Sequence, residues 1–369
     1  AERRILMGLI IDADTHVAES EQMWALLETQ VYSRRPIMMR VPDDTVYGAS
    51  NAFWLIDGNI APKPAGKGGN RLITPSASKR ELSRKDIPVE SRELTEPTLR
   101  LKDMDRLHVD VQVVYPTLFL VYLTDDVELE IALSKAYNRF MSEACSNDGH
   151  RLRWVAVLPL RSVEDSLKEI KWAKDHGAVG LFFRGLEKDR NLDDPYFFPV
   201  YQAAMDHDLS ICIHTGAGSP VMSSLFNVDR HSVFCHGRLL PLIAFRNLVA
   251  NRIPELFPTL KFGFIEASAG WIPFLLHALR RQFRGRWSEL SSPELFQKYR
   301  FYVACEADED VAYLSQYIGE DNLIIGSDYG HNDPSEEGDL VRTIRAREDI
   351  PARMAERILS DNPKRFYNL

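Results

Sequence analysis

The sequence predicts an α/β protein built as a (β/α)8 barrel, the TIM-barrel architecture, on the basis of three observations. Eight short runs rich in β-branched and other apolar residues recur along the 369 residues. Most of them are followed by a stretch with the 3.6-residue period of an amphipathic helix, an alternation typical of parallel sheets covered by helices. No glycine-rich dinucleotide signature follows the first run, which disfavours the alternative of a doubly wound open sheet.

The expected elements follow one another at regular intervals. The first strand lies at 10–16 and begins with the apolar pair Ile10 and Ile11. The other seven are expected, in chain order, at 109–115, 153–158, 178–183, 209–214, 260–265, 300–305 and 322–326. Amphipathic stretches predict helices at 127–145, 163–176, 199–208, 271–283 and 309–317. Residues 329–369 are expected to supply one or two closing helices, the last starting near Pro351.

Residues 20–95 interrupt this rhythm. The segment has scattered prolines and a glycine-rich run at 64–70, and it shows no regular period. A loop of this length in a compact protein is usually functional. Phe53, Trp54 and Ile56 would be out of place on a loop that only faces solvent. We therefore expect one barrel domain, residues 1–369, in which residues 20–95 form an insertion that caps the active site.

Composition excludes several classes of function. The net charge of -8 and the absence of a basic run disfavour a nucleic-acid partner. No apolar stretch approaches the roughly 18 residues needed to span a bilayer. The four cysteines form no C-x-x-C pair, and the N-terminus lacks the features of a signal peptide. We therefore expect a cytoplasmic protein with reduced cysteines and no membrane partner.

Polar side chains follow the expected strands at similar relative positions. Active sites of such barrels are built from residues at the carboxyl ends of the strands. Asp14 and His16 are two residues apart, so in an extended chain their side chains point the same way and can hold one ion. The other candidates at strand ends are Tyr115, Arg184, His214, Glu266, Glu306, Asp328 and His331. Potential ligands after the first, fifth, sixth, seventh and eighth strands predict a metal site at the mouth of the barrel.

The sequence also resembles a known family, the amidohydrolase superfamily. The closest resemblance is to its amidohydrolase-2 branch, which includes aminocarboxymuconate semialdehyde decarboxylase and resorcylate decarboxylases. The similar stretches are 11–16, 213–216, 257–266, 326–331 and 362–367. The resemblance implies a (β/α)8 barrel, a divalent metal at its mouth, and ligands on the first, fifth and eighth strands. It also suggests a homodimer, since relatives commonly form dimers.

Three positions depart from the family pattern. Asp14 stands where the decarboxylases have histidine or glutamate, and Glu266 stands where their sixth strand ends in an acid/base histidine. Arg184 ends the fourth strand, where binuclear relatives carry a bridging carboxylated lysine. The first departure keeps a metal ligand, whereas the second removes the expected general base of hydrolysis or decarboxylation.

Ligand counting suggests a second ion. A single catalytic zinc takes about three protein ligands and a water, and Asp14, His16, His214 and Asp328 would supply them, which leaves Glu266 and His331 in excess. Histidine and carboxylate ligands with open positions are typical of non-haem iron. This pattern resembles a small group of non-haem diiron monooxygenases on the same barrel from terpenoid biosynthesis.

The main hypothesis from the sequence is therefore a non-haem diiron monooxygenase that hydroxylates a bulky apolar carboxylic acid or its thioester in secondary metabolism. Such an enzyme would need O2 and an external electron donor. The two iron ions would be held by Asp14, His16, His214, Glu266, Asp328 and His331, with catalytic roles for Glu266 as the bridge and for Asp328 and His331. The small-molecule substrate would contact Phe53, Trp54, Tyr115 and Arg184.

Two alternatives remain open. In the first, one zinc or manganese ion serves a decarboxylase or hydrolase of a small, aromatic carboxylate, Arg184 pairs with the substrate, and Asp328 or His331 carries the proton. In the second, the metal is structural or lost and the barrel only binds. Arg184 could equally pair with an acid inside the mouth, and Glu306 is more readily a cap of the following helix than a ligand.

Overall fold

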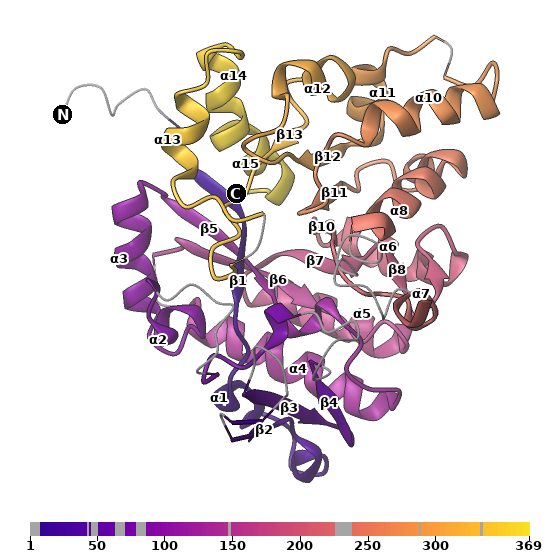
Figure 1. Cartoon of the computed structure of the whole chain (residues 1–369). Coiled ribbons are helices and arrows are strands. Elements are labelled where there is room, and N and C mark those ends of the chain that lie inside the picture. The colour runs from indigo at the N-terminus through magenta and orange to yellow at the C-terminus, as the bar shows by residue number, and fades with distance from the viewer. Residues whose placement is uncertain are drawn as a thin grey trace.

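The computed structural model describes residues 8–42, 44–45, 51–62, 71–78, 86–146, 149–225, 238–287, 289–332 and 335–369. Its main feature is an eight-stranded parallel sheet whose strand order follows the chain (Figure 1). The strands are β1 (Ile11–Val17), β5 (Val111–Pro116), β6 (Leu152–Val157), β7 (Ala178–Arg184), β10 (Ser210–His214), β11 (Phe262–Ile265), β12 (Phe301–Ala304) and β13 (Leu323–Ile324). Sequential parallel strands with helical connections are what right-handed βα repeats produce.

The sheet closes between its last and first strands. Ala13 donates its backbone N–H to Ile325 at 3.1 Å, and His16 donates to Tyr329 at 2.8 Å. In the other direction, the N–H of Asp328 bonds to the carbonyl of Asp14 at 3.0 Å. These bonds join the segment after β13 to β1 and so connect the last strand of the sheet to the first. The predicted (β/α)8 barrel is therefore confirmed.

Helices surround this barrel. The longer ones are α3 (Pro97–Leu107), α4 (Val127–Ala144), α5 (Val163–Asp175), α6 (Phe198–Asp206), α8 (Leu239–Ala250), α10 (Ile272–Gln282), α11 (Ser292–Tyr299) and α12 (Val311–Ile318). Several start where a capping side chain accepts an otherwise unpaired backbone N–H: Asp126 caps α4, Ser162 caps α5 and Ser291 forms a capping box with Glu294 on α11. The five helices predicted from periodicity are confirmed, with their ends shifted by at most two residues.

Shorter elements complete the chain. They are α1 (Glu21–Trp24), α2 (Val89–Arg92), α7 (Pro220–Leu225), α9 (Ile253–Leu256), α13 (Leu340–Arg345), α14 (Ala352–Glu356), α15 (Asn362–Tyr367), and the hairpin of β8 (Leu186–Glu187) and β9 (Arg190–Asn191). The end of the chain thus has three helices where one or two were expected. A π-helical turn at Arg357–Asp361 separates α14 from α15. None of the described helices is long and apolar enough to cross a membrane.

The insertion after β1 contains a small sheet that the sequence analysis missed. Its antiparallel strands are β2 (Ile37–Arg40), β3 (Ala52–Ile56) and β4 (Asn59–Ala61), seen at the bottom of Figure 1, away from α13 and α14. Asp57 and Gly58 join β3 to β4 with φ of 48° and 75°. An Asp-Gly pair of positive φ is the preferred two-residue hairpin turn, so the sequence did contain the signal. The glycine-rich run at 64–70 lies outside the described residues.

Aromatic contacts attach the insertion to the barrel. The ring of Trp24 lies 6.3 Å from that of Trp54 on β3 and 6.3 Å from that of Phe119, which follows β5. Phe53 and Trp54 are 2% and 3% exposed, so both belong to the packed interior. The small sheet therefore packs beside the carboxyl end of β5, and its role as a cap over the active site stays a prediction.

Candidate metal centre

Six buried side chains gather at the carboxyl ends of the strands. Asp14 and His16 lie on β1, His214 ends β10, and Glu266 directly follows β11. Asp328 and His331 lie in the segment after β13, and none of the six residues is more than 7% exposed. Two sets of four ligand atoms lie within 4.8 Å of one another: Asp14, His16, His214 and Glu266, and His16, Glu266, Asp328 and His331. The sequence placed all six at the mouth of the barrel, and the structure brings them together.

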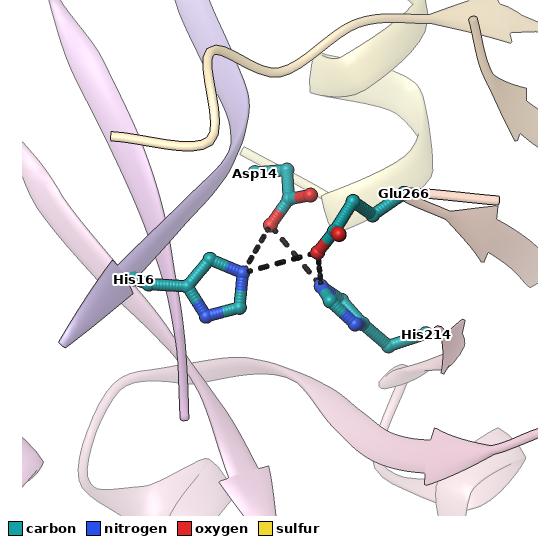
Figure 2. Close-up of side chains that lie close together, drawn as sticks. All are labelled: Asp14, His16, His214 and Glu266. Atoms are coloured by element: carbon teal, nitrogen blue, oxygen red, sulfur yellow. Dashed lines mark ion pairs between the residues drawn. The ribbon is translucent and has the colours of Figure 1, made fainter. Parts of the chain in front are cut away.

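The first set forms a ring in which histidines and carboxylates alternate (Figure 2). Nε2 of His16 lies 3.4 Å from Oδ1 of Asp14 and 3.6 Å from Oε2 of Glu266. Nε2 of His214 lies 3.5 Å and 3.4 Å from the same two oxygens. Four donor atoms from three strands therefore converge on one point.

The second set adds Asp328 and His331 to His16 and Glu266. Nε2 of His16 is 3.4 Å from Oδ1 of Asp328, and the ring of His16 stacks on that of His331 with centroids 3.8 Å apart. Nδ1 of His331 lies 2.8 Å from Oδ1 of Asp328. His16 and Glu266 belong to both sets, so the two sets are adjacent halves of one centre.

The outer nitrogen of each histidine ring is held by a neighbour. Nδ1 of His16 lies 3.0 Å from the carbonyl oxygen of Pro116, and Nδ1 of His214 lies 2.9 Å from that of Thr215. A carbonyl can only accept, so in both rings Nδ1 carries the proton and Nε2 presents its lone pair to the centre. His331 is turned the other way, because its Nε2 lies 2.9 Å from Oγ1 of Thr117 and its Nδ1 faces Asp328.

These residues fit a divalent cation. Oδ1 of Asp14 and Nε2 of His16 and His214 are buried without a hydrogen-bond partner, an arrangement that is costly unless something binds them. Burial, together with His331 and His214, lowers the pKa of His16 well below 6.5, which keeps its imidazole neutral and able to ligate. Imidazole nitrogens and carboxylate oxygens are ligands for zinc, manganese and iron.

Two of the ligands have a strained backbone. Glu266 and Asp328 have φ of 50° and 53°, and Ser268 has φ of 58°. Non-glycine residues seldom adopt this left-handed conformation, which costs of order 1 kcal/mol or more and clusters at functional sites. The left-handed conformation of Glu266 directly after β11, and of Asp328 after β13, turns the chain sharply where these two side chains enter the centre.

Buried polar contacts support the ligands from the neighbouring strands. Asp12 accepts bonds from the N–H of Ser327, at 2.8 Å, and from its hydroxyl, and burial raises the pKa of Asp12 to about 7. Arg100 donates to the carbonyl of His16 at 2.7 Å and to Oε1 of Gln112 at 2.8 Å. The Asp12–Ser327 contact joins β1 to the segment after β13, and the Arg100–His16 contact joins β1 to α3, both beside the ligands.

Glu19 supports the centre through Thr117. Its carboxylate accepts the backbone N–H groups of Thr117, at 3.0 Å, and Leu118, at 2.7 Å. Burial raises the pKa of Glu19 to about 8. Thr117 in turn contacts His331, so three buried residues form a chain that ends at the centre. The sequence analysis missed Glu19 and Thr117, although both follow strand ends, because the pairing of a carboxylate with distant backbone N–H groups leaves no sequence signal.

Arg184 is bound within the barrel mouth. Its Nη2 lies 2.6 Å from Oε2 of Glu187, and its Nη1 donates to the carbonyl of Val121 at 3.2 Å. Its guanidinium also lies over the ring of Tyr122, 4.0 Å from the centroid. The structure thus bears out the alternative of pairing with an acid in the mouth, and a substrate contact by Arg184 stays a prediction.

The other predicted substrate contacts belong to neither ligand set among the described residues. Tyr115 is fully buried with its ring centroid 5.0 Å from that of His214. Its hydroxyl bonds to that of Tyr367 at 2.6 Å, and Tyr367 donates to the carbonyl of Ala13. The hydroxyl of Tyr115 is therefore engaged inside the barrel. Phe53 and Trp54 belong to the insertion sheet, and their substrate contact is likewise untested.

Glu306 belongs to neither ligand set among the described residues. Its Oε1 lies 2.6 Å from Nη1 of Arg238. The preferred alternative from the sequence, that Glu306 caps the next helix, is wrong because Asp310 caps α12 by accepting the N–H of Tyr313 at 2.9 Å. Arg238 was not identified from the sequence.

Comparison with known proteins places this geometry in context. A family model described as Amidohydrolase matches residues 11–369. The 2-amino-3-carboxymuconate-6-semialdehyde decarboxylase of Dictyostelium discoideum is 21% identical over 290 residues, 74% of this chain and 77% of that protein. An amidohydrolase from Mycobacterium avium subsp. paratuberculosis K-10 is similar in structure, with a TM-score of 0.74 and 16% identity over 98% of each chain.

A third similar protein is the 5-carboxyvanillate decarboxylase of Novosphingobium aromaticivorans DSM 12444. Its structure contains manganese and 4-hydroxy-3-methoxy-5-nitrobenzoic acid, and it has a TM-score of 0.68 and 18% identity over 98% of this chain and 96% of that one. At these identities the structural likeness establishes the fold.

These findings correct the main functional hypothesis from the sequence. Two of the relatives named above are decarboxylases, and the structure of one of them contains manganese. The expected diiron monooxygenase is therefore wrong, and the iron, O2 and electron donor that it required lose their basis. Counting ligands could not decide between one ion and two, because a carboxylate in place of a histidine is compatible with either. A metal-binding enzyme of the decarboxylase or amidohydrolase type remains.

Proposed function

The chain belongs to the amidohydrolase family, and from this premise we propose that it is a metal-dependent decarboxylase of a small aromatic or vinylogous carboxylic acid. The observation that carries the proposal is the buried ring of Asp14, His16, His214 and Glu266 at the strand ends. The decarboxylases among its relatives supply the reaction class.

One zinc or manganese ion would be held by these four residues. When bound, such an ion supplies a Lewis acid that attracts and orients a substrate carboxylate. Asp14 and Glu266 contribute two negative charges, and the neutral imidazoles of His16 and His214 contribute none. The set therefore balances a divalent charge, and manganese suits its oxygen ligands.

Asp328 and His331, from the second ligand set, would transfer the proton. Decarboxylation requires a proton to bind the carbon that bears the carboxylate, after which the bond to the carboxylate breaks, its electron pair stays on the substrate and CO2 leaves. Nδ1 of His331 and Oδ1 of Asp328 are 2.8 Å apart and can hold a proton between them. Thr117 keeps the imidazole in place through Nε2. Asp328 and His331 would thus replace the histidine that is absent from the sixth strand.

The insertion at 20–95 would shield this chemistry from water. Trp24 and Trp54 pack it against Phe119 beside the carboxyl end of β5. An apolar cover lowers the local dielectric and strengthens the interactions of the charged substrate with the centre.

The test is a metal count followed by an activity screen. Protein purified with manganese or zinc is expected to hold about one ion per chain by mass spectrometry. It should release CO2 from a member of a panel of hydroxybenzoates, carboxyvanillates and muconate semialdehydes, and the product should carry deuterium at the former carboxylate carbon in D2O. Hydrolysis of amides or lactones without CO2 release from any carboxylate would contradict the proposal.

A further inference from the structure

The residue that directly follows Asp328 is Tyr329, a buried tyrosine. Its backbone is bound on both sides: the N–H donates to Oγ of Ser327 at 3.2 Å, and the carbonyl accepts the N–H of His16 at 2.8 Å. Asp328 and Gly330, which flank it, have φ of 53° and 108°. Tyr329 therefore lies between two residues of positive φ, in the tight turn that carries Asp328 into the second ligand set.

The hydroxyl of Tyr329 joins this turn to two helices. It donates to Oδ2 of Asp103 on α3 at 2.6 Å, and it lies 2.8 Å from Oγ of Ser91 on α2. Since an ionised carboxylate only accepts, the phenolic proton belongs to the bond with Asp103, and Ser91 donates its own proton to Tyr329. Ser91 is buried and belongs to the insertion at 20–95. The hydroxyl is thus the point at which the insertion, α3 and the segment after β13 meet.

The ring of Tyr329 is held as well. The guanidinium of Arg100 on α3 lies over it, 4.4 Å from the centroid, a favourable position for a cation. The same guanidinium donates to the carbonyl of His16 at 2.7 Å. A non-glycine residue keeps a left-handed backbone only where its surroundings leave it no alternative. The contacts of Tyr329 provide such surroundings for its neighbour Asp328.

We propose that Tyr329 is a positioning residue for the pair formed by Asp328 and His331. Its contacts hold Asp328 in the left-handed turn that places Oδ1 2.8 Å from Nδ1 of His331. Ser91 extends this hold to the insertion, so the insertion acts on the pair without belonging to either ligand set. The inference rests on the proposed function, which assigns the transferred proton to this pair, and it names the residue that orients the pair.

Nitrogen NMR of the imidazole rings in the zinc-loaded protein tests the geometry of the pair. Isotope labelling of histidine alone gives signals from only ten residues, and His331→Gln identifies those of His331. Tyr329→Phe keeps the ring over Arg100 and removes the hydroxyl. The signals of His331 should then shift by more than their line width, while those of His277 on α10 stay in place.

The matched control removes a buried hydroxyl elsewhere. Tyr201 on α6 is fully buried, and its hydroxyl donates to the carbonyl of Leu192 at 2.6 Å. Tyr201→Phe therefore loses a comparable hydrogen bond without touching the segment after β13. Its His331 signals and its turnover should be those of the wild type.

Turnover of a substrate from the panel separates positioning from binding. Tyr329→Phe should lower kcat about tenfold or more, as is typical when an orienting partner is lost, and leave KM and the metal per chain within about twofold. Ser91→Ala should lower kcat by about threefold, as expected for the loss of one neutral hydrogen bond. In the Tyr329→Phe background Ser91→Ala should add nothing, because the hydroxyl through which Ser91 acts is already absent.

Three results would overturn the inference: unchanged His331 signals in Tyr329→Phe, the same shift in Tyr201→Phe, or additive losses of kcat for Ser91→Ala and Tyr329→Phe. The two proposals fail in different assays. The proposed function fails if the wild type releases CO2 from no carboxylate in the panel. The NMR comparison needs no substrate, so it decides on Tyr329 whatever the panel shows.

Discussion

The two sides of the barrel hold their charged residues in different ways. On the closing side, formed by β13, β1 and β5 with the segments after them, two buried carboxyl groups and a buried arginine contact the backbone of a neighbouring segment. Asp12 accepts the N–H of Ser327, and Glu19 accepts two N–H groups after β5. Arg100 donates to the carbonyl of His16. Of these, the Asp12 contact adds to the backbone bonds that close the barrel, where β13 has only the two residues Leu323–Ile324.

On the opposite side, formed by β7, β10, β11 and β12 with the segments after them, two arginines pair with carboxylates. Arg184 pairs with Glu187, and Arg238 pairs with Glu306. A contact to the backbone fixes one geometry, whereas an ion pair can exchange one carboxylate for another. The comparison suggests that the closing side fixes the segments of Asp14 and His16 through backbone contacts, whereas the opposite side, which carries His214 and Glu266, holds its arginines through ion pairs.

The largest effect is expected from removing a ligand on either side. Asp14→Ala and His214→Ala should each reduce activity by about three orders of magnitude or more, because losing only a partner of a ligand typically costs 10 to 100-fold. Metal per chain, measured by mass spectrometry, should fall while circular dichroism stays that of the folded barrel. His277→Ala on the exposed face of α10 is the control. Full metal occupancy in both variants would remove the two residues from the ligand set.

Arg184→Ala tests the ion pairs of the opposite side. It leaves Glu187, which is 3% exposed, as a buried carboxylate without its arginine. We expect the free energy of unfolding in urea to fall by about 3 to 5 kcal/mol. Arg184→Met combined with Glu187→Gln should recover part of this loss. If stability is unchanged and KM for the carboxylate substrate rises instead, Arg184 serves recognition rather than the fold.

Thr117→Val tests the closing side. It keeps the shape of the side chain and removes the hydroxyl that contacts Nε2 of His331. We expect kcat to fall by about 10 to 100-fold, as is typical when a ligand or acid/base group loses its orienting partner. Thr117→Ser should restore most of the activity. Equal losses in both variants, or a loss confined to KM, would show that Thr117 only packs.

The sequence predicted the barrel and the six candidate ligands because both follow from local patterns. Strand and helix periods are local, and the ends of parallel strands necessarily share one face. The number of ions, and with it the reaction, could not be predicted from residue types, since Asp14 and Glu266 serve one ion or two equally well. The partners of Glu19 and Arg238 were missed for another reason. Each contact joins segments far apart in the chain and leaves no periodic trace.

The hairpin in the insertion was missed although its signal was present. Asp57-Gly58 separates a buried apolar run from a short second strand, yet the surrounding prolines and glycines made the whole segment resemble an irregular loop. Arg184 shows the opposite limit: its position at a strand end was predicted, but its choice between a substrate and Glu187 depends on the hairpin of β8 and β9.

The smallest expected effect is on the pH dependence of the free energy of unfolding, and it tests the closing side. Burial raises the pKa of Glu19 from 4.5 to about 8, so the folded state binds this proton more tightly than the unfolded state. The stability that it contributes is complete below pH 4.5 and is lost as the pH rises toward 8, at no more than about 1.4 kcal/mol per pH unit.

Glu19→Gln should therefore make the free energy of unfolding less dependent on pH between 5 and 8, whatever its absolute value. Urea unfolding of the metal-loaded proteins at several pH values measures this difference. The buried Asp12 also contributes to the pH dependence, but its contribution cancels in the difference because both proteins contain it. Glu21→Gln, on the exposed face of α1, should follow the wild type. Parallel curves for wild type and Glu19→Gln would mean that Glu19 is already ionised in the folded protein. The closing side would then hold a buried negative charge on two backbone N–H groups.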